Sequence, residues 1–556
     1  MTGSYFCPRA RFPIALLHIA IFLAGAIFMT GLPGFSDASA NESFAAPRLQ
    51  AMRIDWTQQH DLSRINAASG RVFPTIADSA VPVLLPLDMD ALSRDNETNA
   101  VKASEQYLSG FRPTGFFLAG PSGYDATFSF SPASVAGFGD IRLINPIPVT
   151  ISGFAFLYDL PPPVGAVERP APSELAEKFP SLRRQILEHT LRYGFERYGV
   201  PYVVSIPCHD GGHTPRRLSC RNAERVAQRF LQALQFSGGS GKPAPGIGEP
   251  QPFKRPAALS SVFTYHPAGS LIPGSGMKGQ DGSVDKTVYA RIRFPIKQAP
   301  AFANSQSFMH WGDCDQTGMR PRPRGKDAIY LCRVNTKPLT FNEAATENYA
   351  YPWRDNFCEH RYFAVGQCPA GLGHQGQDIR PAHCELRNEG ANRCEAYRHD
   401  VVAPRDAMIL REPWNEALLL HVNTANERIR FRYLHMHPER MNAERLLSGR
   451  MVREGEMLGQ VGNFNRRENW TTYHLHVELQ VPTRDGWVRV NPYMTLVASY
   501  EHLIQGRGTE ITDPANEPQD LSGHEATAAK SLKSGKAKTS KAKAPRQKFR
   551  KFKRRR

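Results

Sequence analysis

Histidine and aspartate side chains recur in separate short segments at spacings that suit a catalytic metal. His374 and Asp378 lie in Gly-His-Gln-Gly-Gln-Asp, while His474 and His476 lie in Tyr-His-Leu-His-Val-Glu. His435, in Tyr-Leu-His-Met, falls between the two. Imidazole and carboxylate groups bind catalytic zinc, which takes three protein ligands and leaves one position open for water. This set of side chains therefore indicates a hydrolytic metal site with more histidines than the metal needs as ligands.

The last of these segments reads as a β-strand. His474 and His476 are two positions apart in a run of β-forming residues. Residues two apart on a strand project from the same face. Both imidazoles are therefore expected to point into one cleft, while Leu475 and Val477 pack on the other face.

The first segment reads as a glycine-rich loop. His374 and Asp378 are four positions apart and can converge on one ion if the backbone turns between them. Gly373 and Gly376 permit such a turn, because glycine adopts conformations that other residues avoid. Each spacing also occurs by chance, but their joint presence in this order predicts one site.

Residues 351–505 resemble the lysostaphin/LytM-type zinc metallopeptidases, which cut peptide cross-links of peptidoglycan. That family has a His-x-Gly-x-Asp-Ile motif, then Tyr-x-His-Leu, and finally His-Leu-His-Phe-Glu. The counterparts in this chain are His374-Gln-Gly-Gln-Asp-Ile379, Tyr433-Leu-His-Met436 and His474-Leu-His-Val-Glu478. Glycine-spaced turns precede the last motif in the family, and Gly455 to Asn463 is similar.

The resemblance implies a role for each of the five polar residues. His374, Asp378 and His476 are expected to ligate Zn2+, with water in the fourth position. His435 and His474 are left without a metal bond. One of them is expected to take the proton of the water as general base, and the other to stabilise the developing oxyanion.

Three functions are compatible with these motifs. The first is an exported zinc metalloendopeptidase, a hydrolase of peptide bonds in peptidoglycan cross-links or stem peptides. The second is a catalytically inactive LytM-like envelope protein that activates another cell-wall hydrolase. The third is a zinc protease of secreted proteins. The complete ligand set favours an enzyme over the inactive protein, and a substrate panel separates the two enzymes.

The N-terminus predicts export. Arg9 and Arg11 precede a mostly apolar run over 12–32, and Ala38-Ser39-Ala40 offers a small-residue cleavage site. A run of this length could also stay in the membrane as an anchor. Either way, we expect the bulk of the protein in the periplasm or cell envelope.

Eight cysteines follow the leader, an even number that in an exported chain indicates disulfide bonds. The alternative, a cysteine zinc site, is disfavoured because the sequence has no Cys-x-x-Cys. His209 and His213, beside Cys208, are interpreted as part of a loop held by a disulfide. Proximity in sequence suggests four pairs: Cys208 with Cys220, Cys314 with Cys332, Cys358 with Cys368 and Cys384 with Cys394.

The formal charge of +17 is concentrated in the C-terminal tail. Lys530 to Arg556 contains 14 Lys or Arg and no acidic residue, so 17 − 14 leaves about +3 for the rest. Such a segment is expected to be disordered. It could hold an anionic envelope polymer or lipid, or have no partner. No nucleic acid is expected outside the cytoplasm, and the oligomeric state is not predicted.

With 556 residues, 41% of them hydrophobic and 22% charged, the chain is typical of a soluble protein with more than one core. The resemblance implies the fold class: an α+β N-terminal domain followed by a mainly antiparallel β LytM-type peptidase domain, with a disordered basic tail after it. The predicted boundaries are 1–40 for a signal peptide or anchor, 41–240 for a mixed α+β domain of unknown role, 241–258 for a Gly/Pro-rich linker, 259–505 for the zinc metallopeptidase domain with its motif core at 351–500, and 506–556 for the tail.

The apolar spacing also predicts individual elements. Helices are expected over 173–198, 222–235 and 493–505. Strands are expected over 202–206, 287–294, 401–403, 417–422, 428–433, 473–481 and 487–492.

Overall fold

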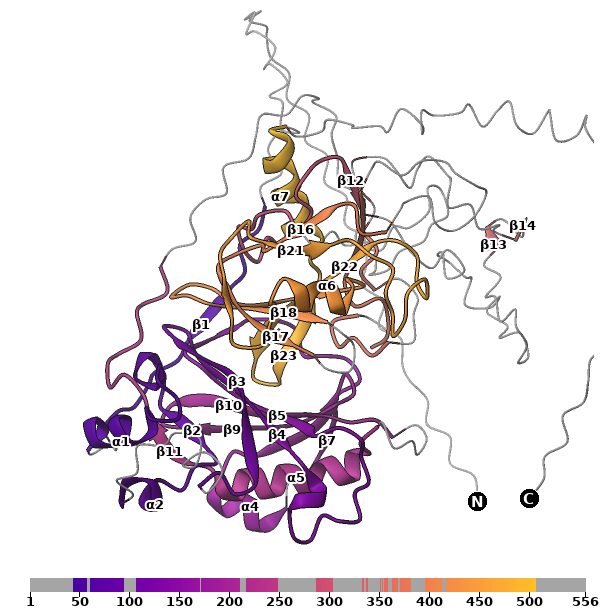
Figure 1. The fold of residues 1–556 in the computed structure, drawn as a ribbon. Helices are drawn as coiled ribbons and strands as arrows, with labels where there is room; N and C mark the ends of the chain where they lie inside the picture. The colour runs from indigo at the N-terminus through magenta and orange to yellow at the C-terminus, as the bar shows by residue number, and fades with distance from the viewer. Residues whose placement is uncertain are drawn as a thin grey trace, which may run out of the picture. The chain divides into compact units, whose positions relative to one another are not determined.

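The computed structural model is dominated by antiparallel sheets and has few helices (Figure 1). The chain divides into two units, Met1–Glu42 and Ser43–Arg556, and every described residue belongs to the second. The predicted leader and nearly all of the predicted tail therefore lie outside the described part. The structure describes residues 44–57, 61–94, 107–170, 172–210, 217–248, 287–303, 333–334, 337–338, 351, 353, 355–358, 363–368, 371–381, 396–412 and 417–506.

Seven antiparallel strands form the N-terminal sheet, the lower one in Figure 1. Helix α5 (Cys220–Ala233) packs on it with an apolar stripe of Ala223, Val226, Ala227 and Phe230, the spacing of an amphipathic helix. Ser219 caps this helix by accepting a hydrogen bond from the Asn222 amide at 3.2 Å. In spatial order the strands are β3 (Phe111–Gly120), β4 (Gly123–Phe130), β5 (Ile147–Phe154), β10 (Val200–Pro207), β9 (Thr190–Arg197), β8 (Arg183–Leu187) and β7 (Val167–Arg169).

Smaller elements complete this half of the described chain. Two short strand pairs form separate sheets, and the helices here have 14 residues or fewer. The pairs are β1 (Leu49–Ala51) with β6 (Phe156–Tyr158) and β2 (Val83–Leu85) with β11 (Gln235–Gly238). The remaining helices are α1 (Leu62–Ser69), η1 (Ile76–Asp78), α2 (Met89–Arg94), η2 (Pro132–Ser134) and α4 (Ser173–Lys178).

The predicted long helix over 173–198 is wrong. Helix α4 ends at Lys178, and strands β8 and β9 follow as a hairpin. Leu191, Tyr193 and Phe195 are buried at a spacing of two, which is the period of a strand. The helix over 222–235 and the strand over 202–206 are confirmed as α5 and β10. The mixed α+β class and the domain boundaries stay predictions.

Eight strands form the C-terminal sheet, and β23 (Gly486–Val490) pairs with its strand β22. Helix α7 (Tyr493–Ile504) follows, and α6 (Pro438–Ala443) lies after β19. The other strands in spatial order are β12 (Ala301–Ala303), β15 (Gln377–Pro381), β22 (Leu475–Thr483), β19 (Arg428–Leu434), β18 (Leu418–Asn423), β17 (Ala407–Arg411) and β20 (Met451–Val452). Two separate pairs are β16 (Asp400–Val402) with β21 (Met457–Gln460) and β13 (Arg333–Val334) with β14 (Lys337–Pro338).

Most predicted elements of this half are confirmed, namely the strands near 401, 417–422, 428–433, 473–481 and 487–492 and the helix at 493–505. The strand predicted over 287–294 is wrong. Val288 and Phe294 are buried in the core, but the segment joins no sheet. The Tyr289 amide instead donates to the Thr495 hydroxyl at 3.0 Å. The alternating apolar residues of this segment are therefore buried without being part of a sheet.

Each sheet has an apolar core of its own, and Trp487 of β23 belongs to a smaller third cluster that joins residues of both sheets. Its ring packs with Phe154 and Val203 of the N-terminal sheet, and its indole N–H donates to the Ser152 hydroxyl at 3.1 Å. None of the described helices is long and apolar enough to cross a bilayer.

Two of the four predicted disulfides are confirmed, Cys208–Cys220 and Cys358–Cys368. The other two pairs fall on residues outside the described part. His209 donates its amide to Leu218 and stacks its ring on His189 at 5.0 Å, whereas His213 is not among the described residues.

Candidate metal centre

Three neighbouring strands of the C-terminal sheet bring the predicted residues together. Strand β22 lies between β15 and β19, with His476 directly opposite Asp378 on one side and Leu434 on the other. His374 precedes β15, and His435 directly follows β19. Segments about a hundred positions apart therefore meet because adjacent strands are in register.

His374, Asp378 and His476 form a group of possible metal ligands whose donor atoms all lie within 4.8 Å of one another. The His374 Nε2 atom lies 3.1 Å from the His476 Nδ1 atom and 3.3 Å from the Asp378 Oδ1 atom. The third edge, from His476 Nδ1 to Asp378 Oδ1, is 2.8 Å. All three side chains are buried.

The ring of His374 is oriented by a backbone carbonyl. Its Nδ1 lies 2.8 Å from the Asn356 carbonyl oxygen, and because a carbonyl only accepts, Nδ1 carries the hydrogen. The Nε2 lone pair therefore faces Asp378 and His476. Asn356 is itself fixed, since its amide donates to the Gln377 side chain at 3.2 Å and its side chain accepts from the Asp378 amide at 3.3 Å.

The ring of His476 is oriented by a carboxylate. Its Nε2 lies 3.4 Å from the Glu478 Oε1 atom, which leaves the Nδ1 lone pair for the centre. Burial alone would raise the pKa of Glu478, but Arg432 and Arg489 hold that pKa well below its usual value. Glu478 is thus an ionised acceptor, the partner that metal-ligating imidazoles commonly have.

His435 and His474 lie beside the group with their rings 4.5 Å apart. Each Nδ1 donates to a backbone carbonyl at 2.8 Å, from His435 to Phe464 and from His474 to Thr472. Burial lowers the pKa of His435 to about 4 and that of His474 well below its usual value. Both rings are therefore neutral near pH 7, each with an Nε2 lone pair that can accept a proton.

The backbone at His435 is unusual. Its φ of 74° places it in the left-handed region that residues with a side chain seldom occupy. Such conformations cost free energy and cluster at functional sites. Here the conformation falls immediately after β19, where the chain must leave the sheet and still present an imidazole beside His474.

The two glycines of the first motif do not serve as predicted. Neither Gly373 nor Gly376 has a positive φ, and Asp378 lies on strand β15 rather than in a loop. The glycines permit close approach instead. A Cβ on Gly376 would lie 2.1 Å from the Val477 carbonyl oxygen, and a Cβ on Gly373 would lie 2.7 Å from the Cys358 Cα atom. The expected burial of Leu475 and Val477 on the opposite face is confirmed.

The donor set fits a zinc ion. A tetrahedral zinc with bonds of about 2.1 Å separates its ligand atoms by roughly 3.4 Å, so the observed triangle is slightly tighter than the ion requires. Two imidazole lone pairs and one carboxylate oxygen face a common point. Burial alone would raise the pKa of Asp378, but His374 and His474 hold that pKa well below its usual value, so the carboxylate is ionised.

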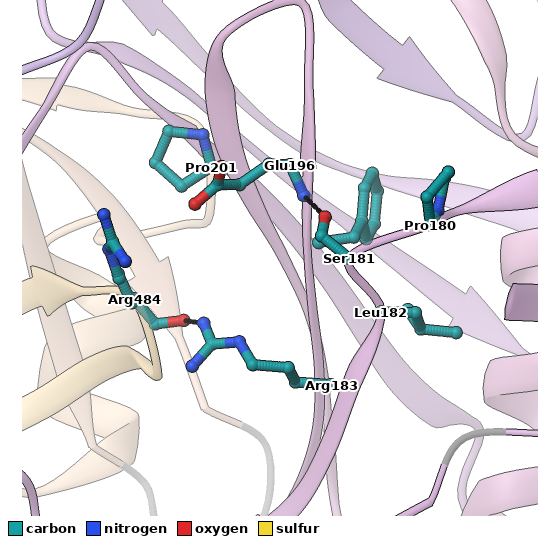
Figure 2. Close-up of a pocket in the computed structure, with 8 residues that line it drawn as sticks. Pro180, Ser181, Leu182, Arg183, Glu196, Pro201 and Arg484 are labelled. Atoms are coloured by element: carbon teal, nitrogen blue, oxygen red, sulfur yellow. Dashed lines mark hydrogen bonds between the residues drawn. The ribbon is translucent and has the colours of Figure 1, made fainter.

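A cleft of about 470 Å³ lies elsewhere in the described part (Figure 2). It is lined by Leu182, Phe195 and Arg484 among others, and the Arg183 guanidinium donates to the Arg484 carbonyl at 2.7 Å. None of the five predicted site residues lines it. His437, near the second motif, caps helix α6 by accepting from the Glu439 amide, so its role is structural.

Sequence reasoning missed the residues that support the ligands. Glu478 could have been found, because it continues the two-residue spacing of His474 and His476 on the same strand face. Asn356 acts through its backbone carbonyl, for which the residue type gives no signal. Arg489 and Arg432 are ordinary strand residues in the sequence, and only the fold brings them to Glu478.

Three solved structures are similar to parts of this chain. A putative glycyl-glycine endopeptidase LytM from Ruminococcus gnavus has 23% identity over 23% of this chain and 47% of its own, with a TM-score of 0.17. The catalytic domain of the M23 protein EnpA from Enterococcus faecalis has 19% identity over 20% of this chain and 86% of its own, with a TM-score of 0.12. Csd3 from Helicobacter pylori has 11% identity over 70% of this chain and 55% of its own, with a TM-score of 0.17.

This chain thus spans about half the length of the first and third of these structures. No protein-family model and no curated protein matches it. At such TM-scores the similarities assign no activity to the chain.

Proposed function

We propose that this chain is a zinc-dependent metalloendopeptidase that hydrolyses peptide bonds in the cross-links or stem peptides of peptidoglycan. The observation that carries the proposal is the convergence of His374, Asp378 and His476, with donor atoms within 4.8 Å, beside the neutral imidazoles of His435 and His474. A purely structural histidine cluster has no need of two lone pairs and an ionised carboxylate aimed at one point.

His374 Nε2, Asp378 Oδ1 and His476 Nδ1 would hold the zinc ion. When bound, zinc supplies Lewis acidity that makes water nucleophilic near neutral pH and polarises the scissile carbonyl. Asn356 contacts the Nδ1 atom of His374, and Glu478 contacts the Nε2 atom of His476. Each contact is on the ring nitrogen that does not face the centre, so it holds the other nitrogen in the orientation that a metal ion needs.

His435 and His474 would handle the protons. Each presents an Nε2 lone pair, because its Nδ1 hydrogen is used by a carbonyl. One takes the proton of the attacking water, and the resulting imidazolium can return it to the leaving amine. The other would take a proton from solvent at its Nε2 atom and, as an imidazolium, donate it in a hydrogen bond to the developing oxyanion. The Asp378 carboxylate, 3.5 Å from the His474 Nε2 atom, would stabilise positive charge on His474.

The substrate class rests on the motif resemblance of residues 351–505. An exported location, in the periplasm or cell envelope, is part of the proposal and is supported by the leader-like sequence of residues 1–40. The disulfides Cys208–Cys220 and Cys358–Cys368 suit an oxidising compartment. The basic segment 530–556 is proposed to hold an anionic envelope polymer or lipid.

The proposal is tested on purified protein by metal analysis and by digestion of muropeptides analysed by mass spectrometry. We expect about one zinc per chain, cleavage of a peptide bond, loss of cleavage on chelation and recovery when zinc is restored. His374→Ala should lose both zinc and cleavage, whereas His437→Ala, which alters a nearby helix cap, should lose neither. Cleavage by a metal-free protein would contradict the proposal, and zinc binding without any cleavage would favour the activator.

A further inference from the structure

We propose that Glu188, at the tip of the β8–β9 hairpin of the N-terminal sheet, is a positioning residue for the metal centre of the C-terminal sheet. Its single carboxylate links the groups that orient both histidine ligands. The affinity of the centre for zinc then depends on a residue outside the motif-bearing half of the chain. This inference rests on the zinc site of the proposed function.

The hairpin presents Glu188 in a fixed conformation. Leu187 pairs with Thr190, and the two residues between them, Glu188 and His189, have φ values of 53° and 56°. Two consecutive positive φ values in a two-residue loop match the twist of the flanking strands and make a tight turn. The Glu188 side chain is only 2% exposed, so a rigid turn directs a buried charge out of its own sheet.

One oxygen of Glu188 reaches the support of His476. Its Oε2 lies 2.9 Å from Nη1 of Arg489 on β23, and the Nε atom of that arginine lies 2.7 Å from Oε2 of Glu478. The other oxygen of Glu478 faces His476 Nε2 at 3.4 Å. The contacts therefore run without a gap from the N-terminal sheet to the imidazole.

The other oxygen of Glu188 reaches the support of His374. Its Oε1 accepts from the Gly366 amide at 3.1 Å, inside the loop closed by Cys358–Cys368. The Cys358 amide, at the start of that loop, donates to the His374 carbonyl at 3.0 Å. Two residues earlier is Asn356, whose carbonyl orients the His374 ring. The same carboxylate thus holds the loop beside the other ligand.

Glu188 brings a second guanidinium group into this network. Arg192 of β9 also contacts Glu188 at 3.2 Å, and Arg432 of β19 contacts both Glu478 and Glu412. The network then joins three carboxylates, Glu188, Glu412 and Glu478, to three guanidinium groups, Arg192, Arg432 and Arg489.

Without the Glu188 carboxylate, Arg192 and Arg489 each lose an ionised partner near a dication site. Arg489, deprived of one partner, is free to draw Glu478 away from His476. Buried charges that lose their partner are strongly unfavourable, so the side chains around Arg489 are expected to rearrange. That rearrangement would change the orientation of the His476 ring and weaken zinc binding.

The decisive experiment measures the zinc dissociation constant of the full chain by competition with a chromogenic chelator. Glu188→Gln keeps the size of the side chain but turns an amide donor toward a guanidinium that needs an acceptor. We expect about tenfold weaker zinc binding, the lower end of the effect of outer-shell substitutions. The matched control is Glu224→Gln, which removes the 2.6 Å ion pair of Arg184 on the same hairpin without contacting the network. It should bind zinc within about twofold of the wild type.

A second variant covers the case in which Glu188→Gln does not fold. Arg489→Lys keeps the charge but offers one ammonium group in place of a fork that spans two carboxylates, and it should also weaken zinc binding severalfold. Thermal unfolding of each variant with saturating zinc checks the fold.

Unchanged zinc affinity in the folded Glu188 or Arg489 variant would overturn the inference, and so would an equal loss in the Glu224 control. If the wild-type chain binds no zinc, the proposed function itself fails, which is a different result.

Discussion

The Asp125 carboxylate of β4 and the Arg428 guanidinium of β19 form an ion pair of 2.6 Å in which neither side chain is exposed. Arg430 contacts the same carboxylate at 3.0 Å and lies over the Trp487 ring at 3.8 Å. Asp125 thus supplies the acceptor for two buried cations of the other sheet. The contact between the sheets therefore combines a buried ionic cluster with the packing of Trp487.

Asp125→Asn should destabilise the protein strongly. The substitution preserves shape but leaves Arg428 and Arg430 buried without an ionised partner, which typically costs 3–5 kcal/mol, an order-of-magnitude figure. Chemical denaturation followed by circular dichroism measures the free energy of unfolding. Asp140→Asn is the control, since its pair with Arg225 at 2.5 Å is largely exposed and should leave stability nearly unchanged. Equal effects of the two substitutions would contradict a central role for the buried pair.

The same cluster predicts a loss of stability in acid. Burial and the nearby Arg430 lower the pKa of His421 to about 3, and its Nδ1 accepts from the Arg430 Nε atom at 3.2 Å. Between its ordinary pKa of about 6.5 and 3, the unfolded chain binds a proton on His421 that the folded chain does not. Stability should therefore fall as the pH falls through this window.

Asp125 also makes the free energy of unfolding fall as the pH falls, but at lower pH values than His421 does. Burial alone would raise the pKa of Asp125, but Arg428 and Arg430 hold it well below the usual value, so its contribution is lost below about pH 3.8. Between about pH 4 and pH 6, His421→Gln should make the slope of unfolding free energy against pH shallower by up to about 1.4 kcal/mol per pH unit. His502→Gln, in the last turn of α7, is the surface control. An unchanged slope in the His421 variant would refute this assignment.

The convergence of the five candidate residues was predictable because the information lies in short spacings. His474 and His476 alternate on one strand face, and His374 with Asp378 forms a recognisable motif. The residues that orient the candidate ligands were not predictable, because their contacts depend on packing between segments that are far apart in the sequence. Glu188 and Arg489, for example, are separated by 301 positions. No local pattern marks a carboxylate at a hairpin tip as a partner of a distant strand.

The fold shows the same division. Helix α5 has a clear apolar stripe and was predicted, whereas residues 173–198 mix a helix-like start with the strand alternation of Leu191 and Tyr193. Residues 287–294 have the apolar composition of a strand and are buried as one would be. Whether such a segment pairs depends on a free sheet edge, which the sequence does not encode locally.

The disulfide Cys358–Cys368 should matter for metal binding, and Cys208–Cys220 should not. The two close loops of similar sequence separation, 10 and 12 residues, so each should stabilise the fold by roughly 2–3 kcal/mol through the unfolded chain. Only the first encloses Gly366 and adjoins Asn356. Replacing both cysteines of each pair by serine should lower the melting temperature comparably, while zinc affinity falls only for the 358–368 variant. Equal zinc affinity in both would show that the loop does not support His374.

His435→Ala and His474→Ala should separate proton transfer from metal binding. Neither residue belongs to the His374, Asp378 and His476 group, so both variants should retain zinc, measured on purified protein. Hydrolysis of a muropeptide should fall by about 10²–10⁴-fold, the usual loss when a positioned acid or base is removed.

His374→Ala provides the contrast, because it should lose zinc and hydrolysis together. The hydrolysis rate of the double variant of His435 and His474 should lie within about tenfold of the rate of the less active single variant. The effects of groups that act in one reaction step are not additive. Full activity of either single variant would remove that histidine from the proton pathway, and loss of zinc from His474→Ala would instead place it among the ligands.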